Sequence, residues 1–303
     1  MRPYSPSAPH SPSVLNFIVE DVKVCSLASG SNGNIYYVEF GDDAIVVDMG
    51  ISFRRLKNRA QTRHIDLKKI RAVLVSHEHS DHVYGLPALC RHTGAMAYMT
   101  RGTFDGMRVK YRPAQENIRF INIGDPITIG PFTAYSFDKP HDVEEPCSFR
   151  IEVNGVNVGV FTDIGDVCPG LEQNLALCNL AFLESNYDED MLRNGNYPAY
   201  LKNRIVSGRG HLSNIQAADL VRRLAPPALH TIFLSHISHE NNRPTLALQA
   251  FDDLRQKYEI RVMSRDEASD VWSVTTQRAT CLPPVIEIPE RLDRVPLNIF
   301  SAI

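Results

Sequence analysis

The sequence lacks the hydrophobic segments that direct proteins into or across membranes. Its first 13 residues, MRPYSPSAPHSPS, contain no apolar signal-peptide core, and no run reaches the ~18 consecutive apolar residues of a membrane-spanning helix. We therefore expect a cytoplasmic protein with no membrane partner. Because proline and serine dominate residues 1–13, we expect a disordered tail there. Residues 283–303, which contain four prolines, are expected to form a C-terminal extension.

The sequence also has no excess of positive charge. Its 32 Lys and Arg residues stand against 35 Asp and Glu residues, which gives a net charge of −3. No overall positive field would therefore attract DNA or RNA. Any contact with nucleic acid must depend on a local basic patch or on bound metal.

Paired cysteines are absent as well. Six cysteines are scattered without any C-x-x-C pair, at positions 25, 90, 147, 168, 178 and 281. This pattern favours buried, reduced thiols of the kind found in cytosolic proteins.

The apolar content, 43%, is sufficient to bury a large core. Short apolar runs between turn signals predict strands from about residue 22 to 162, including a hairpin at Asn154-Gly155. After about residue 170 strands alternate with helices, which we expect at 188–206, 213–224 and 245–258, with residues 175–185 as a buried strand. This order indicates the α/β (α+β) class, with two β-sheets back to back and flanking helices, in a domain spanning 14–282.

The most informative segment is VLVSHEHSDHVYGL, residues 73–86. The chain has 11 histidines, and His77, His79 and His82 lie within six positions, next to Asp81. Such crowding is unfavourable unless a cation binds the groups. The cluster directly follows a predicted buried strand, so the alternating His77 and His79 can face one ion while Asp81 and His82 face a second. Imidazole and carboxylate together suit zinc, manganese or iron better than calcium.

Three other side chains follow predicted strands and could complete two coordination shells. They are His141 in FDKPHDVEEP, Asp163 in VGVFTDIG and His236 in TIFLSHISHENN. Taken alone, His141 could be a surface residue, Asp163 a turn former and His236 a buried, hydrogen-bonded histidine. Their shared position at strand ends favours a joint site, in which the Asp163 carboxylate could bridge both ions.

A further pair of residues is a candidate for proton transfer. Glu184 ends a predicted buried strand, and His211 lies between Gly210 and a predicted helix start. A Glu184–His211 pair would hold the imidazole oriented and protonated, as a general acid requires. Helix capping beside an unrelated histidine is the alternative.

These residues carry a family resemblance. The order H-x-H-x-D-H, His, Asp, His resembles the metallo-β-lactamase superfamily, and Asp48 in VVDMG matches the aspartate that orients a metal ligand there. The segments SLASGSNGN, SHEHSDHVYGL and LESNYDEDMLRNGNYPAYLKNRIVSGRGHLSN are similar to the YycJ/WalJ-type metallohydrolases of bacteria, and the similarity runs from about residue 22 to 270.

The resemblance implies an αββα metallo-β-lactamase sandwich with two Zn or Mn ions. It implies that one ion binds His77, His79 and His141, that the other binds Asp81, His82 and His236, and that Asp163 bridges them. It further implies a 5′→3′ exonuclease that acts on DNA.

Two neighbouring ions could share a hydroxide, because the pKa of bound water falls to about 7. This hydroxide would attack phosphorus. We expect Asp81 to position or deprotonate the nucleophile while binding metal. We expect His211, oriented by Glu184, to protonate or stabilise the leaving oxygen.

The segment between Met191 and His211 predicts the substrate contacts. It carries four basic residues and no acidic residue, and such a segment could grip a nucleic-acid backbone. Arg204, Arg209 and Asn186 are the candidate contacts, and an ordinary solvated helix face is the alternative interpretation. An RNA-processing nuclease, a thioester or lactone hydrolase of the same fold, a non-enzymatic module and a flavo-diiron-type oxidoreductase stay open as other functions.

Overall fold

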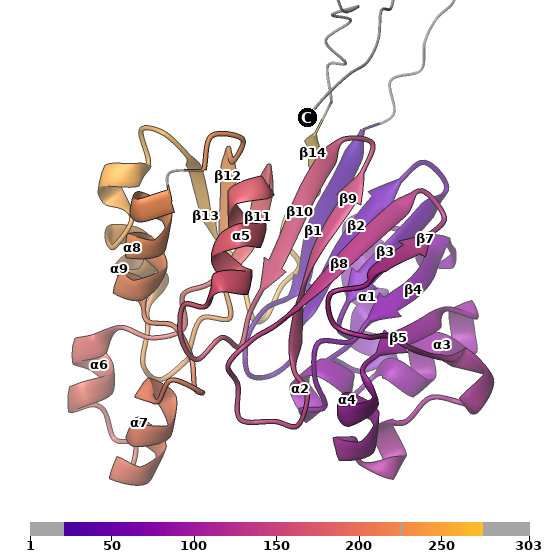
Figure 1. The fold of residues 1–303 in the computed structure, drawn as a ribbon, viewed down its shortest axis with the longest axis horizontal. Helices are drawn as coiled ribbons and strands as arrows, with labels where there is room; N and C mark the ends of the chain where they lie inside the picture. The colour runs from indigo at the N-terminus through magenta and orange to yellow at the C-terminus, as the bar shows by residue number, and fades with distance from the viewer. Residues whose placement is uncertain (1–20, 225, 275–303) are drawn as a thin grey trace, which may run out of the picture.

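The computed structural model describes residues 21–224 and 226–274. Two seven-stranded sheets pack face to face with helices on their outer sides, so the predicted αββα sandwich is confirmed (Figure 1). The tail predicted at 1–13 and the extension predicted at 283–303 lie outside the described residues. The limits of the predicted domain, 14–282, stay a prediction.

Each sheet contains a parallel half and an antiparallel half. The first sheet is built from β1 (Val22–Ala28), β2 (Ile35–Phe40), β3 (Asp43–Val47), β4 (Ile70–Leu74), β5 (Met96–Met99), β6 (Ile118–Phe120) and β14 (Trp272–Val274). Its strand order is β14-β1-β2-β3-β4-β5-β6, and β3 to β6 are parallel.

The second sheet is built from β7 (Pro126–Ile129), β8 (Phe132–Asp138), β9 (Cys147–Val153), β10 (Val156–Phe161), β11 (Leu180–Glu184), β12 (Thr231–Ser235) and β13 (Glu259–Val262). Its strand order is β13-β12-β11-β10-β9-β8-β7, and β10 to β13 are parallel. The hairpin predicted at Asn154-Gly155 joins β9 to β10 and is confirmed.

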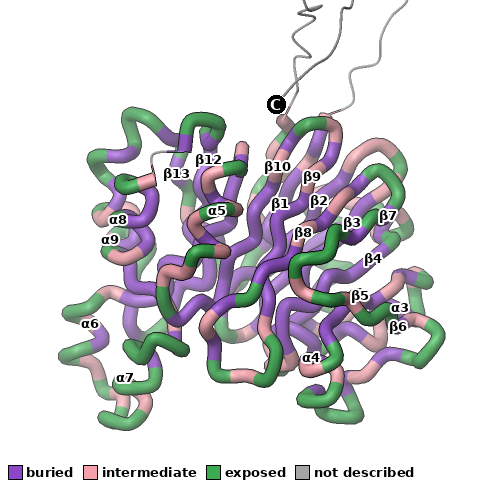
Figure 2. The backbone as a smooth tube through the Cα atoms, in the orientation of Figure 1, coloured by how far each residue is buried: buried purple, intermediate pink, exposed green. Residues whose placement is uncertain are grey.

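The core lies between the sheets, because alternate side chains of each strand point to the same face. Tyr36, Phe149, Phe182 and Phe233 are among its fully buried members, and burial of each large apolar side chain contributes about 1.5–3 kcal/mol. Figure 2 shows buried backbone along the strands and exposed backbone on the outer helices. Within the described part of the chain all five cysteines are free thiols, and four of them are buried.

Five helices cover the outer faces of the sheets. The first sheet is covered by α1 (Phe53–Thr62) and α3 (Leu86–Thr93), and the second by α5 (Pro169–Leu177), α8 (Asn214–Leu224) and α9 (Pro244–Gln249). Four other helices lie at one end of the sandwich, at the bottom of Figure 1: α2 (Ser80–Val83), α4 (Arg101–Gly106), α6 (Glu189–Asn194) and α7 (Ala199–Val206). Across residues 21–224 and 226–274, no helix has the length and apolar character needed to cross a membrane.

Three secondary-structure predictions are wrong in part. The helix predicted at 188–206 is two helices, because Pro198 cannot donate a backbone hydrogen bond and starts α7 anew. The helix predicted at 245–258 ends at Gln249 and continues as a 3-10 turn, η4 (Asp252–Leu254), next to the fully buried Phe251. Residues 175–177 of the predicted strand belong to α5, because a continuous apolar run in the sequence does not show where a helix ends and the next strand begins.

Candidate metal centre

The predicted site residues come together because six strands end at the same edge of the sandwich. β3 and β4 are parallel to each other, as are β10, β11 and β12. β8 is antiparallel to β9, which is antiparallel to β10, so β8 runs in the same direction as β10. In sheets of this kind, loops at the carboxyl ends of strands form the ligand crevice. The segments after these strands carry Asp48, His77, His141, Asp163 and His236.

Backbone geometry aims several of these side chains. Asp48, Asp163 and His236 have φ values of 62°, 55° and 56°, in the left-handed region that non-glycine residues seldom adopt. Each of the three directly follows, or nearly follows, the end of its strand. Such conformations cost about 1–3 kcal/mol each and persist where the surrounding structure enforces them, often at functional sites.

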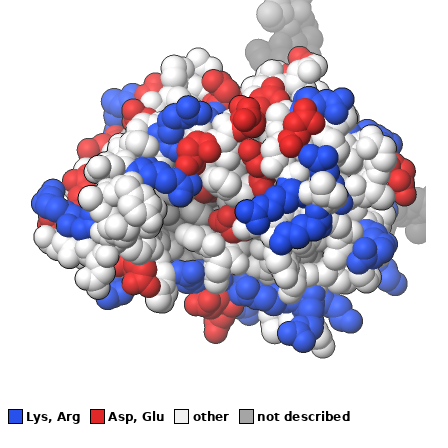
Figure 3. All heavy atoms as spheres, turned by 90° about the horizontal axis from the view of Figure 1, so that it is seen from below, with Lys and Arg blue, Asp and Glu red and all other residues white. Residues whose placement is uncertain are grey.

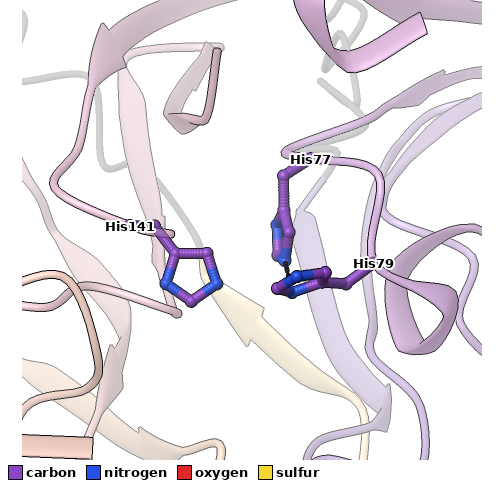
Figure 4. Close-up of side chains that lie close together, drawn as sticks. All are labelled: His77, His79 and His141. Carbon is purple, nitrogen blue, oxygen red and sulfur yellow. Dashed lines mark hydrogen bonds between the residues drawn. The ribbon is translucent and has the colours of Figure 1, made fainter. Parts of the chain in front are cut away.

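Three imidazoles form the first group. His77 and His79 lie between β4 and α2, and His141 lies between β8 and β9. Figure 4 shows the three rings approaching one another from these two loops. Nε2 of His77 is 3.1 Å from Nδ1 of His79, and one nitrogen from each ring lies within 4.8 Å of the other two.

The second group consists of Asp81, His82 and His236, whose possible ligand atoms also lie within 4.8 Å of one another. Asp163 adjoins the second group, with Oδ2 3.1 Å from Nε2 of His82 and Oδ1 3.5 Å from Nε2 of His236. It also clusters with His77. The structure therefore brings all seven predicted ligands into one cluster.

Two of the histidines are held by a protein acceptor on the nitrogen remote from this cluster. Nδ1 of His82 donates to Oδ2 of Asp48 over 2.7 Å, and Nδ1 of His141 donates to the carbonyl of Gly210 over 3.3 Å. Both acceptors fix the tautomer, so Nε2 is the nitrogen left with a lone pair. Protein acceptors on the remote nitrogen are typical of histidines that bind metals.

Three buried atoms of the cluster lack a hydrogen-bond partner in the described structure: Nε2 of His141, Oδ2 of Asp163 and Nε2 of His236. An unpartnered polar atom in a protein interior costs about 1–3 kcal/mol. A divalent cation would satisfy all three, since imidazole nitrogen and carboxylate oxygen are ligands for zinc and manganese. The donor set therefore fits metal ions.

The electrostatics of the cluster also favour cations. Burial opposes ionisation of Asp163, but the nearby His236 and His82 hold its pKa well below the usual value. Burial lowers the pKa of His236, yet the carboxylates of Asp163, Asp81 and Glu184 outweigh it and raise the pKa to about 10. Buried negative charge here demands a positive counter-charge, which protons or divalent cations can supply.

Asp48 lies behind the cluster. Its Oδ1 accepts the backbone N–H of Ser76 over 2.8 Å, and its Oδ2 accepts the Ser76 hydroxyl and Nδ1 of His82. Both oxygens are used by these contacts. Asp48 therefore orients His82.

Glu184 contacts two histidines, one more than the sequence predicted. Its Oε1 accepts from Nδ1 of His211 over 2.8 Å and from Nδ1 of His236 over 3.1 Å. Its Oε2 accepts the backbone N–H groups of Ile164 and Leu212. Burial opposes ionisation, but His211 and His236 lower the Glu184 pKa to about 2, so the carboxylate is charged at neutral pH.

The predicted substrate contacts are all engaged within the protein. Nε of Arg204 is 2.5 Å from Oδ2 of Asp142, and Nε of Arg209 donates to the carbonyl of His141 over 3.2 Å. The buried Asn186 amide donates to the carbonyl of His236 over 2.8 Å. Arg204 and Asn186 nevertheless line a pocket of about 230 Å³ that is also lined by five of the seven clustered side chains and by His211.

Sequence reasoning missed Asn34, which is fully buried beside the cluster. Its backbone N–H donates to the carbonyl of Asp81 over 2.8 Å, and its Nδ2 lies 3.1 Å from Nε2 of His82. The segment SGSNGN around it predicts a turn and belongs to the family resemblance, but neither observation singles out Asn34 as a site residue.

Comparison with known proteins identifies the family. The model of the β-lactamase superfamily domain matches residues 43–237, which include all seven clustered side chains. The chain belongs to the metallo-β-lactamase superfamily. As a member of this superfamily, it is a hydrolase with His and Asp residues positioned to bind metal.

Within the metallo-β-lactamase superfamily, the predicted YycJ/WalJ-type relationship is confirmed. The chain is 33% identical over 222 residues to exodeoxyribonuclease YycJ of Bacillus anthracis. This alignment covers 73% of the chain and 84% of the relative. It is 32% identical over 230 residues to exodeoxyribonuclease WalJ of Streptococcus pneumoniae, covering 74% and 85%. The Zn²⁺-bound structure of PqqB from Methylobacterium extorquens has a TM-score of 0.62 at 17% identity, covers 82% of this chain and 99% of its own, and supports the fold.

Proposed function

We propose that the protein is a binuclear metal-dependent phosphodiesterase that degrades DNA from its 5′ end. The observation that carries the proposal is that seven potential metal ligands converge in one cluster. Three of them have a buried donor atom without a hydrogen-bond partner in the described structure. The choice of DNA is supported by the relatives named exodeoxyribonucleases. Activity on DNA would place the protein in the cytoplasm, where its buried thiols would stay reduced.

In this proposal His77, His79 and His141 hold one ion, Asp81, His82 and His236 hold the other, and Asp163 contacts both. The ligand types suit zinc or manganese. Two such ions, when bound, supply an activated water at neutral pH and neutralise charge on the phosphoryl oxygens.

The chain's own groups perform the remaining tasks. Although burial opposes it, His82 and His236 lower the pKa of Asp81, so its carboxylate is ionised and can orient the attacking water. The charged Glu184 accepts from Nδ1 of His211, which leaves Nε2 to deliver a proton to the leaving oxygen. His211 lines the pocket beside the ligands, where a leaving group would lie.

The proposal is tested with end-labelled oligonucleotides. Metal-loaded protein should release labelled mononucleotide at once from a 5′-labelled single-stranded DNA and produce a ladder of shortened products from a 3′-labelled one. RNA of the same sequence, and parallel assays with Zn and Mn, decide the substrate and metal. Asp81→Ala should lower the rate about 100-fold or more, because it removes both a ligand and the group that orients water.

If wild type cleaves neither nucleic acid, a thioester or lactone substrate becomes the better assignment. If Asp81→Ala cleaves as fast as wild type, the role given to Asp81 is wrong.

Asp48→Asn should weaken metal binding without unfolding the protein. The amide keeps the volume of the carboxylate but cannot accept at both positions, so His82 loses its orientation. We expect a loss of about 10- to 100-fold in affinity for one ion, as is typical for groups behind metal ligands. Competition with a chromophoric chelator measures this loss. Asp43→Asn, at the other end of β3, is the matched control, and equal affinities for the two variants would contradict the role.

A further inference from the structure

A second, larger hollow adjoins the metal pocket. This groove, of about 1020 Å³, shares His79, Asp81 and Arg204 with the pocket lined by five of the clustered side chains. The two therefore form a continuous path that leads outward from the candidate ligands. Figure 3 shows this face of the molecule, with basic side chains on both sides of the hollow and acidic side chains among them.

Three arginines line the groove, and one of them has no side-chain partner among the described residues. Arg204 is paired with Asp142, and Arg209 donates to the carbonyl of His141. Arg108, between α4 and the 3-10 helix η2 (Val109–Tyr111), is exposed and has no ion pair or side-chain hydrogen bond with any described residue. Its guanidinium is therefore available to an anionic ligand, and its planar fork suits phosphate oxygens.

Aromatic rings lie next to this arginine. Tyr111 lines the groove, and the ring of Tyr84, which is 53% exposed, lies 5.9 Å from it between centroids. Nζ of Lys110 is 4.8 Å from the Tyr111 centroid, which adds a second cation near these rings. An exposed ring near cations is the combination that binds unpaired bases and their phosphates, and Tyr84 is that ring because Tyr111 is only 7% exposed.

Acidic groups in the same groove restrict where a polyanion can lie. Glu78, Asp142 and Glu144 all line it. Asp142 is neutralised by Arg204. A phosphate chain would avoid Glu78 and Glu144, so the wall that carries Arg108 offers the favourable contact.

We propose that Arg108 binds a backbone phosphate of a single-stranded nucleic acid, away from the phosphodiester that is cleaved. This inference rests on the proposed nuclease function. In this proposal Arg108 contributes to substrate affinity and therefore lowers KM for long substrates. A substrate that is too small to reach from the metal cluster into the groove does not contact Arg108.

The test compares Arg108→Glu with wild type and with Arg91→Glu. Arg91 is an exposed arginine of α3 that has no side-chain partner within residues 21–224 and 226–274 and does not line the groove. Binding is followed by fluorescence anisotropy with a labelled phosphorothioate oligonucleotide on the metal-loaded protein. We expect Arg108→Glu to bind single strands about 10- to 100-fold more weakly, since a charge-assisted phosphate contact is lost. The slope of log affinity against log salt should become shallower by about 0.7. Arg108→Lys should recover part of the affinity.

Cleavage provides the second measurement. For a long oligonucleotide, the KM of Arg108→Glu should rise with kcat nearly unchanged, while hydrolysis of bis(p-nitrophenyl) phosphate should be the same in all four proteins. Equal binding by wild type and Arg108→Glu would overturn the proposal, and an equal loss for duplex DNA would overturn the assignment to single strands. If wild type binds DNA without cleaving it, the nuclease function fails, while the anisotropy still decides the role of Arg108.

Discussion

Replacing Asp163 with alanine is expected to remove both metal ions and to abolish hydrolysis. Asp163 is the carboxylate that clusters with His77 on one side and with His236 on the other. Its oxygens lie 3.1 Å from His82 and 3.5 Å from His236, both of the second group, and His77 links it to the first group. If it bridges the ions as proposed, each ion loses a charged ligand at once. We expect activity to fall by on the order of 1,000-fold or more, since several kcal/mol of charge stabilisation disappear.

The measurement is metal content by atomic emission after reconstitution and desalting, with circular dichroism to check folding. Asp163→Asn is the isosteric variant, which keeps the volume of the side chain and loses its charge. His236→Ala is the matched comparison, because His236 belongs to the second group alone, and it should lose one ion chiefly. An Asp163→Ala protein that retained both ions would refute the bridging role, and one that lost the same single ion as His236→Ala would confine Asp163 to one shell.

The fold and the cluster were predictable where the signal was local or repeated. His77, His79, Asp81 and His82 occupy a single short segment after a strand, so their convergence needs little tertiary information. His141, Asp163 and His236 were predictable for a different reason. Each follows an apolar strand, and strands that run in the same direction within a sheet bring the residues after them to one edge.

What could not be predicted depends on contacts between distant segments or on backbone conformation. The hydrogen bond of Glu184 to His236 joins residues 52 positions apart, and the contact of Asn34 with His82 spans 48 positions. No local pattern contains these pairs. The pairing of Arg204 with Asp142 likewise depends on where α7 packs, and it changes which arginine is free to meet a substrate. The three left-handed conformations after strands are also set by the assembled fold.

The second large effect is expected at His211. His211→Ala should lower kcat on DNA by about 100- to 10,000-fold, the usual contribution of a positioned general acid. The reason is that a nucleotide leaving as an alkoxide needs a proton, whereas p-nitrophenolate leaves without one. Hydrolysis of a p-nitrophenyl phosphodiester should therefore be nearly unaffected, and metal content should stay at the wild-type value. This difference between the two substrates separates proton donation from a structural role.

The control for this variant is His239→Ala. His239 is 69% exposed in its side chain, lies in the same loop as His236 and contacts Glu240 over 2.7 Å, so its loss should leave both substrates unaffected. Glu184→Gln should resemble His211→Ala on DNA, but it should also weaken one ion, because the same carboxylate accepts from His236. Equal losses on DNA and on the p-nitrophenyl ester for His211→Ala would show that His211 supports the site as a whole. In that case the proton must reach the leaving oxygen from another group or from solvent.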